Sequence, residues 1–115
     1  MSDDPVPMGN KVIVAGKSIA LRYPVDQAIR HGDYLIVRYA VTAHLGRPGT
    51  FQNLEAVRLD GTVKWTAELP TNETGDCYYE VEVDSARALV ARSFKSYVCK
   101  IDWESGKILE SEFVK

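Results

Sequence analysis

The chain has few of the side chains that catalyse reactions or bind metals. Among its 115 residues are only two cysteines, Cys77 and Cys99, and two histidines, His31 and His44. Two cysteines are too few for a disulfide framework and their spacing matches no zinc motif, although the sequence leaves open whether they pair with each other. Neither histidine has a second ligand nearby at the spacing of a metal site. We therefore expect no bound metal and no cofactor.

Sequence motifs of common catalytic and nucleotide-binding sites are also missing. The chain has no Gly-x-Ser-x-Gly motif, which holds the nucleophile of many hydrolases. Residues 16–18, Gly-Lys-Ser, end like a phosphate-binding loop, but the glycine required five residues earlier is Lys11. A strand-like segment also follows, where that motif requires a helix. The sequence thus assigns no catalytic residue, and we do not expect an enzyme.

Long apolar segments and an excess of positive charge are absent as well. No apolar run approaches the roughly 18 residues of a membrane-spanning helix, so we expect no membrane insertion. The net charge is −2 and neither half of the chain is basic, so we expect no binding to nucleic acids. The first residues are acidic and rich in proline and lack the apolar segment of a secretory signal, which predicts a cytoplasmic protein.

Length and composition predict one folded domain. Hydrophobic residues make up 45% of the chain and charged residues 26%, as is typical of globular proteins. A chain of 115 residues has the size of a single domain and buries enough surface to fold without disulfides or metals. Residues 1–10 have the composition of a flexible N-terminal tail, and residues 11–115 are expected to form a single all-β domain.

Short apolar or alternating segments, separated by turn residues, predict strands along the whole domain. The turns recur roughly every 8 to 12 residues, which is typical of antiparallel all-β proteins. Residues 25–30 are compatible with either a strand or one helical turn. The segments expected to form strands are 11–15, 18–23, 34–41, 54–59, 62–69, 77–83, 88–94, 97–102 and 107–114.

Alternation within these segments predicts which side chains face the core. In residues 62–69, apolar side chains from Val63 to Leu69 alternate with polar ones. In residues 77–83, the same alternation places Tyr79, Val81 and Val83 toward the core. One apolar and one polar face is what an antiparallel sheet exposed to water on one side requires.

Two parts of the chain resemble each other. Residues 54–65 and 97–109 each run as a strand, an aspartate, a turn with glycine and a second strand. The strands that precede them also match loosely, so the repeat units are about 25–70 and 77–115. Each unit reads as four strands. The sequence therefore predicts an all-β, mostly antiparallel fold with two four-stranded sheets, arranged as a β-sandwich or an incomplete propeller.

The turn of the second unit resembles that of a β-propeller blade of the quinoprotein type. In those blades an Asp-x-x-Gly-Lys turn joins the two outer strands, and a tryptophan often follows. Residues 102–107, Asp-Trp-Glu-Ser-Gly-Lys, are similar to this turn, and residues 60–65, Asp-Gly-Thr-Val-Lys-Trp, to a shortened form of it. Aspartate accepts hydrogen bonds from turn amides, and glycine adopts a positive φ without steric cost.

The resemblance implies two propeller-blade-like sheets but not a complete propeller. Closed propellers need four to eight blades, so two blades would have to form a sandwich, assemble with copies of the chain or bind another protein. The cofactor of quinoproteins lies on the axis of a complete ring, so no quinone cofactor is expected here.

The loop of residues 42–53 is the most unusual segment. It has 12 residues between two expected strands, whereas hairpin loops usually have two to five. Arginine and aromatic side chains on long loops are typical of protein interfaces. We predict that His44, Leu45, Arg47 and Phe51 bind a partner, with Arg47 and Phe51 as the anchors. The alternative is a loop that packs on itself, with Leu45 and Phe51 against the sheet.

These features favour a non-catalytic protein-interaction module over an enzyme. The partner would be another protein or a second copy of the chain, and a small acidic protein without catalytic groups suits an inhibitor or immunity role. The alternative is a small-ligand-binding protein or small enzyme with a pocket between the two sheets, lined by Tyr34, Tyr78 or Tyr97.

Three carboxylates are expected on one face of the strand 77–83, namely Glu80, Glu82 and the following Asp84. Acidic strand faces are common on soluble proteins, where they keep the surface hydrated. Calcium binding is the alternative, because this cation prefers oxygen ligands. We expect the solvated face.

Overall fold

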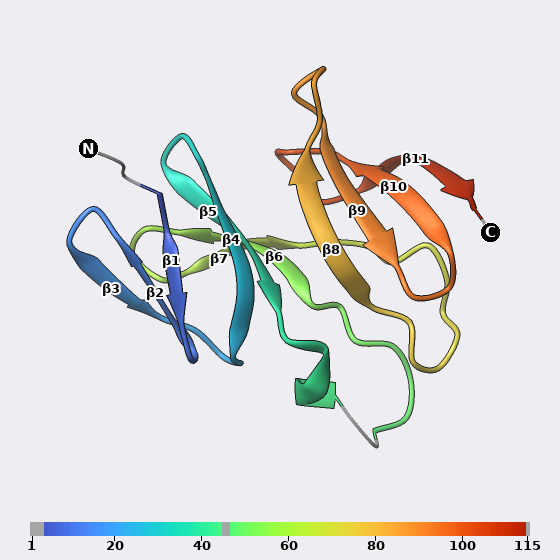
Figure 1. The fold of residues 1–115 in the computed structure, drawn as a ribbon, viewed down its shortest axis with the longest axis horizontal. Helices are drawn as coiled ribbons and strands as arrows, with labels where there is room; N and C mark the ends of the chain where they lie inside the picture. The colour runs from blue at the N-terminus through green and yellow to red at the C-terminus, as the bar shows by residue number, and fades with distance from the viewer. Residues whose placement is uncertain (1–3, 45–46, 115) are drawn as a thin grey trace.

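The computed structural model describes residues 4–44 and 47–114 and shows an all-β fold of three antiparallel sheets (Figure 1). The strand order is β1-β2-β3 in the first sheet, β4-β5-β6-β7 in the middle sheet and β11-β10-β9-β8 in the last sheet. A short 3₁₀ helix, η1 (Val41–His44), follows β5. No helix within the described residues is long and apolar enough to cross a membrane. The strands are β1 (Val6–Met8), β2 (Lys11–Val14), β3 (Lys17–Ala20), β4 (Val25–His31), β5 (Tyr34–Tyr39), β6 (Leu54–Arg58), β7 (Val63–Thr66), β8 (Tyr78–Val83), β9 (Leu89–Ser93), β10 (Tyr97–Ile101) and β11 (Ile108–Phe113).

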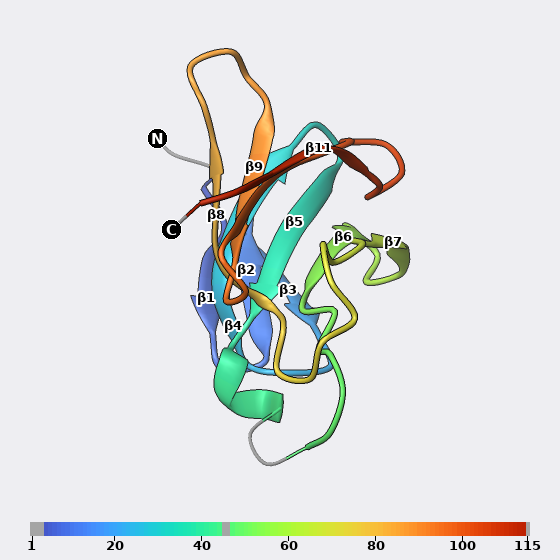
Figure 2. The same cartoon turned by 90° about the vertical axis from the view of Figure 1, so that its right-hand side faces the viewer.

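The first, middle and last sheets follow one another from left to right in Figure 1, and Figure 2 shows the same fold turned by 90°. One core cluster lies between the first and middle sheets and includes Val12 and Leu35. A second lies between the middle and last sheets and includes Ile36 and Leu89. Each fully buried aliphatic side chain contributes about 1.5 to 3 kcal/mol to folding. Because both faces of the middle sheet are covered, every residue of its strand β5 is buried.

The first sheet corrects the prediction of a flexible tail, made for residues 1–10, at residues 6–8. Residues 6–8 form β1, which pairs antiparallel with β2. Pro7 lies within β1, and a proline is tolerated there because β1 is an edge strand. The fold therefore has three sheets where the sequence predicted two. Residues 25–30, for which strand and helical turn were both open, lie in β4.

The middle and last sheets share their strand order and their irregularities. Each is a four-stranded meander within one of the two predicted repeat units. A bulge interrupts the pairing of the first two strands after Val25 in one sheet and after Tyr78 in the other. A second bulge interrupts the last two strands after Ala56 and after Lys100. Two bulges at matching places identify which residues of the two sheets correspond.

This correspondence corrects the sequence alignment of the two aspartates. Counted from the second bulge, the residue that matches Asp102 is Arg58, and Asp60 lies two positions further on. The backbone N–H of Arg58 donates to Thr62 O at 2.8 Å, and that of Asp102 donates to Lys107 O at 2.8 Å. The two turns are therefore closed in the same way by different residue types. The relationship to quinoprotein blades stays a prediction.

The bulges also explain why some side chains face solvent although the alternation in the sequence predicted that they face the core. Tyr79 falls within the first bulge of the last sheet and is 44% exposed, not inward as predicted. Val83, at the end of β8, is also exposed. Val63 points outward because the second bulge of the middle sheet shifts its register. Trp65 and Val81 are buried as predicted.

The turn between β10 and β11 packs on the middle sheet. The backbone oxygen of Trp103 accepts hydrogen bonds from the Tyr34 hydroxyl and from the Trp65 Nε1, both at 2.8 Å. The Trp103 ring stacks on His31 with the ring centroids 3.9 Å apart. Burial, followed by the negative charge of Glu104, raises the pKa of Tyr34 to about 12.

This shifted pKa predicts a loss of stability at high pH. Tyr34 has an ordinary pKa of 10.0 when it is solvated, so the unfolded chain loses this proton first and the free energy of unfolding falls as the pH rises from about 10 to 12. Urea unfolding at several pH values measures this decline. The variant Tyr34→Phe should show a shallower decline over the same range, and identical slopes would contradict the prediction.

Candidate functional site

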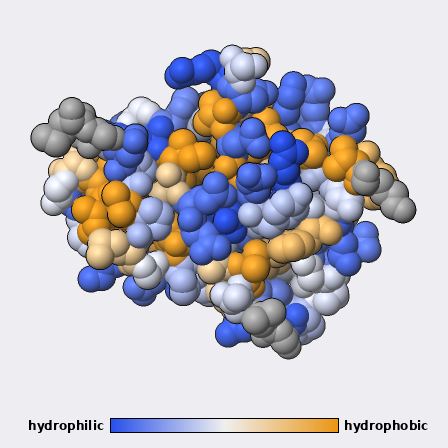
Figure 3. All heavy atoms as spheres, in the orientation of Figure 1, coloured by the Kyte–Doolittle hydropathy of each residue, from blue (hydrophilic) through white to orange (hydrophobic). Residues whose placement is uncertain are grey.

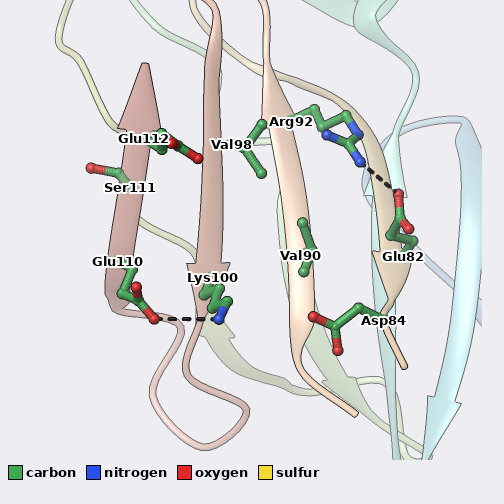
Figure 4. A pocket seen from close by; sticks show the side chains of 9 residues that line it. All are labelled: Glu82, Asp84, Val90, Arg92, Val98, Lys100, Glu110, Ser111 and Glu112. Atoms are coloured by element: carbon green, nitrogen blue, oxygen red, sulfur yellow. Dashed lines mark hydrogen bonds and ion pairs between the residues drawn. The ribbon is translucent and has the colours of Figure 1, made fainter. Parts of the chain in front are cut away.

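A hollow of about 570 Å³ lies on the uncovered face of the last sheet. All four strands of that sheet, and the turn after β8, contribute to its lining (Figure 4). We call this surface the open face. The residues of the open face are Glu82, Asp84, Val90, Arg92, Val98, Lys100, Glu110, Ser111 and Glu112.

The two cations of the open face are held by carboxylates of neighbouring strands. Arg92 contacts Glu82 at 3.2 Å and Lys100 contacts Glu110 at 3.4 Å (Figure 4). Arg92 also contacts Glu80 at 3.2 Å. These side chains are partly exposed, so each pair contributes at most about 1 kcal/mol to stability. Four acidic and two basic residues line the hollow, which leaves a net charge of −2. The open face therefore attracts positive charge.

One row of residues across the strands shows how the open face differs from a covered face. The matching rows are Ile29, Ile36, Ala56 and Trp65 in the middle sheet, and Glu82, Val90, Lys100 and Glu110 in the last sheet. The first row is apolar and packs against the last sheet. The second carries three charged side chains and has no further sheet on it within the described chain. Charged residues at the end of a stack suit contact with water or a polar partner, not with another sheet of the same kind.

The carboxylates singled out in the sequence lie on or beside this face. Glu80 and Glu82 bind Arg92, while the carboxylate of Asp84 accepts hydrogen bonds at 2.9 Å from the backbone N–H groups of Ala86 and Ala88. The described part of the chain contains no group of three or more His, Cys, Asp or Glu that could hold a metal ion. Two of the three carboxylates thus bind Arg92, and the third accepts hydrogen bonds from the backbone of the turn after β8.

Apolar surface does not single out a binding site on the side of the molecule seen in Figure 1. Apolar side chains there form several areas separated by hydrophilic ones (Figure 3). The exposed aromatic residues Tyr79 and Phe94 pack on each other with their ring centroids 5.1 Å apart. Small exposed apolar areas of this kind are normal on protein surfaces.

The loop of residues 42–53 packs largely on the body of the protein. Phe51 is 7% exposed and belongs to the core between the first and middle sheets, where its ring meets Tyr23 edge-on at 5.2 Å. His44 stacks on Phe51 at 5.1 Å, and its Nε2 lies 3.3 Å from Gly49 O. Arg47 is exposed.

The structure therefore corrects the prediction that Phe51 is an exposed anchor. Its ring is buried against the sheet, as in the alternative considered for this loop. Leu45 lies outside the described residues. The loop brings His44 and Phe51 together and leaves Arg47 in solvent, so partner binding by His44 and Arg47 stays a prediction.

A buried polar cluster next to this loop has no counterpart in the sequence predictions. The carboxylate of Glu55, 1% exposed, accepts hydrogen bonds from Tyr39 and Thr66, each at 2.8 Å, and from Arg22. Burial and the Glu55 contact raise the pKa of Tyr39. Both oxygens of Glu55 are occupied, so the cluster offers no free base. No local sequence pattern predicts this cluster, because its members come from four separate segments of the chain.

The tyrosines expected around a pocket between the sheets are core residues. Tyr34 and Tyr78 are buried between the middle and last sheets, and the Tyr78 hydroxyl donates to Glu68 O at 2.6 Å. Tyr97 packs against the edge of the same cluster. Tyr34 also lines a hollow of about 420 Å³, but the other residues of that hollow belong to the first and middle sheets and their turns, so it does not lie between the middle and last sheets.

The two cysteines are buried free thiols in different clusters. Cys77 lies between the first and middle sheets, and Cys99 between the middle and last sheets. Burial is the main cause that raises the pKa of both thiols, which keeps them protonated and unreactive. The sequence left open whether the two cysteines pair. In the structure they lie in different clusters and do not form a disulfide.

No curated protein matches the chain. One family model matches residues 6–113, from the first residue of β1 to the last residue of β11, so all three sheets belong to the unit that the family shares. The chain is therefore a member of the family described as Domain of unknown function (DUF7957).

Proposed function

We propose that this protein is a non-catalytic protein-interaction module that binds a basic protein surface through the open face. The observation that supports this most is the row of charged residues Glu82, Lys100 and Glu110 at positions that are apolar and covered in the middle sheet. A hollowed, uncovered sheet face with a net charge of −2 complements positive charge on a partner.

The polar character of the open face indicates a reversible complex. Val90 and Val98 form the apolar part of its lining, and charged side chains line the rest. Non-obligate interfaces have such a mixture, and their charges contribute mainly to association rate and specificity. An acidic domain that covers a basic surface of a larger protein would act as an inhibitor or an immunity protein, which is the class of role we propose.

The alternative of a ligand-binding protein or small enzyme has less support. Tyr34 and Tyr78 are buried in the core between the middle and last sheets, and the buried carboxylate of Glu55 is saturated by its partners. On the open face, Arg92 and Lys100 are paired with carboxylates. None of these groups is free to act as a general base or nucleophile.

Capture of partners from a lysate of the native host tests the proposal. The tagged wild-type chain should retain a partner in stoichiometric amount, and the double variant Glu82→Lys, Glu110→Lys should lose at least about nine-tenths of it, because like charges then meet at the interface. The matched control Asp33→Lys, Glu73→Lys makes the same charge change on exposed turns away from the open face. It should retain the partner.

Two results would contradict the proposal. One is the absence of any stoichiometric partner of the wild-type chain. The other is equal capture by the open-face variant and the wild type. Capture should also weaken as salt is added, because exposed charges are screened over about 8 Å at physiological ionic strength.

A further inference from the structure

The two edges of the last sheet differ in how their backbone groups are satisfied. On the β8 edge, side-chain amides of the middle layer take the place of a neighbouring strand. The Asn53 carboxamide accepts from Tyr78 N at 2.8 Å and donates to Tyr78 O at 2.7 Å. The Gln27 carboxamide does the same for Val81 N and O, both at 3.0 Å. A carboxamide has the same donor and acceptor as a peptide group, so these two side chains close the edge at Tyr78 and Val81.

The opposite edge, formed by β11, is open. The N–H of Val114 donates to Ser96 O at 2.7 Å. In an antiparallel pair, hydrogen-bonded positions alternate, so Glu112 and Glu110 bond to β10 while the backbone groups of Ser111 and Phe113 point away from the sheet. Only the beginning of this edge is closed, where Ile108 N donates to Glu68 Oε1 at 2.8 Å. No strand of the described chain pairs with the rest.

The side chains of β11 separate into an acidic and an apolar side. Glu110 and Glu112 belong to the open face. Phe113 is 57% exposed, and its ring packs edge-on against Tyr97 on the other side of the strand. Leu109, 64% exposed, is the extra residue of the bulge in the pairing with β10. Native proteins normally shorten, cover or charge an edge of this kind, because its free backbone groups pair readily with another chain.

The charges of β11 disfavour a second copy as the added strand. Antiparallel pairing of two β11 strands about Ser111 would place Glu110 of one copy opposite Glu112 of the other, and parallel pairing in register would oppose identical glutamates. Like charges directly opposite each other destabilise a strand pair. A segment with lysine or arginine at alternate positions would instead place opposite charges beside Glu110 and Glu112.

We propose that β11 binds an extended basic segment of a partner protein as an additional strand of the last sheet. The segment alternates lysine or arginine, facing Glu110 and Glu112, with apolar residues on the side of Phe113. Its backbone bonds to the free groups of Ser111 and Phe113, the mode of β-strand addition. This inference rests on the proposed function, because it names the partner chemistry at one border of the open face.

Proline at residue 111 tests strand addition directly. In the free protein the N–H of Ser111 points to solvent, so Ser111→Pro removes a donor that the fold does not use, and a proline is tolerated at such an edge position. The probe is a capped six-residue peptide of alternating lysine and valine, titrated calorimetrically. We expect Ser111→Pro to weaken its binding at least about tenfold, and the matched variant Ser111→Ala, which keeps the backbone N–H, to weaken it much less.

Backbone N-methylation of the peptide separates strand addition from attraction between charges. Methyl groups on the odd residues and on the even residues give two peptides of equal charge that block opposite edges of the same strand. We expect one to bind like the parent and the other to bind at least about tenfold more weakly. On binding, the Ser111 and Phe113 amides should become protected from hydrogen exchange.

The outcomes distinguish this inference from the proposed function. Binding that survives Ser111→Pro but is lost in Glu82→Lys, Glu110→Lys would overturn strand addition and leave the open face as the binding surface. A wild-type chain that does not bind the peptide at millimolar concentration would overturn the inference, while lysate capture would still test the open face by itself. A concentration-dependent dimer abolished by Ser111→Pro would also overturn it, in favour of self-pairing.

Discussion

Replacing Asn53 with alanine is expected to lower the free energy of unfolding by about 4 kcal/mol, a large part of the 5 to 15 kcal/mol that stabilises a typical domain. Asn53 is fully buried and its carboxamide makes three hydrogen bonds, two with the backbone of Tyr78 and one with Tyr39 O at 3.0 Å. Alanine leaves these buried backbone groups without a partner, and each such group costs about 1 to 3 kcal/mol.

The neighbouring residue provides a control for this prediction. Gln52 makes one hydrogen bond, to Ala67 O at 3.1 Å, and lies near the surface, so Gln52→Ala should cost about 1 kcal/mol. Urea unfolding followed by circular dichroism measures both values. Asn53→Ala should also free the β8 edge at Tyr78 and increase aggregation of the native protein. Equal losses for the two variants would contradict the role assigned to Asn53.

Sequence patterns predicted the strands because their signals are local. Alternation and turn residues mark the segments that became β5 to β11, and the two four-stranded sheets lie within the predicted repeat units. The first sheet was missed over residues 6–8 because a proline and a charged terminus conceal a short edge strand. The bulges were missed because an extra residue such as Tyr79 changes the face of a strand without changing its composition.

The candidate site was less predictable because it depends on which face remains uncovered. The sequence placed Glu80 and Glu82 outward correctly, but it could not show that Lys100 and Glu110 lie in the same row, since this requires the pairing of four strands. The loop of residues 42–53 illustrates the opposite error. An aromatic residue in a long loop can anchor a partner or fill the core, and the packing of Phe51 between two sheets decides for the core.

The glycines of the two turns that follow β6 and β10 have different surroundings, and this difference has a large energetic consequence. Gly106 has φ +76° and lies directly on the Trp65 ring, where an added Cβ would be 2.5 Å from Trp65 Cε3. Trp65 cannot move aside easily, because it is buried and its Nε1 donates to Trp103 O. Gly61, in the other turn, has φ +93° and open space around it.

Gly106→Ala is therefore expected to lower the free energy of unfolding by about 3 kcal/mol, and the matched control Gly61→Ala by about 1 kcal/mol. The control measures the cost of a positive φ alone, while Gly106→Ala adds the overlap with the ring, for which about 1 to 3 kcal/mol is typical. Urea unfolding followed by circular dichroism compares both with the wild type without relying on the fluorescence of Trp65.

A double-mutant cycle tests whether the ring is the cause. In a Trp65→Leu background, which itself loses a buried aromatic contact, Gly106→Ala should cost only the roughly 1 kcal/mol of the strained φ, so the coupling between the two positions should be about 2 kcal/mol. Additive losses would contradict the proposed overlap. A measured coupling would show that the middle and last sheets are held in place by a close approach of backbone to ring, which only glycine permits at this position.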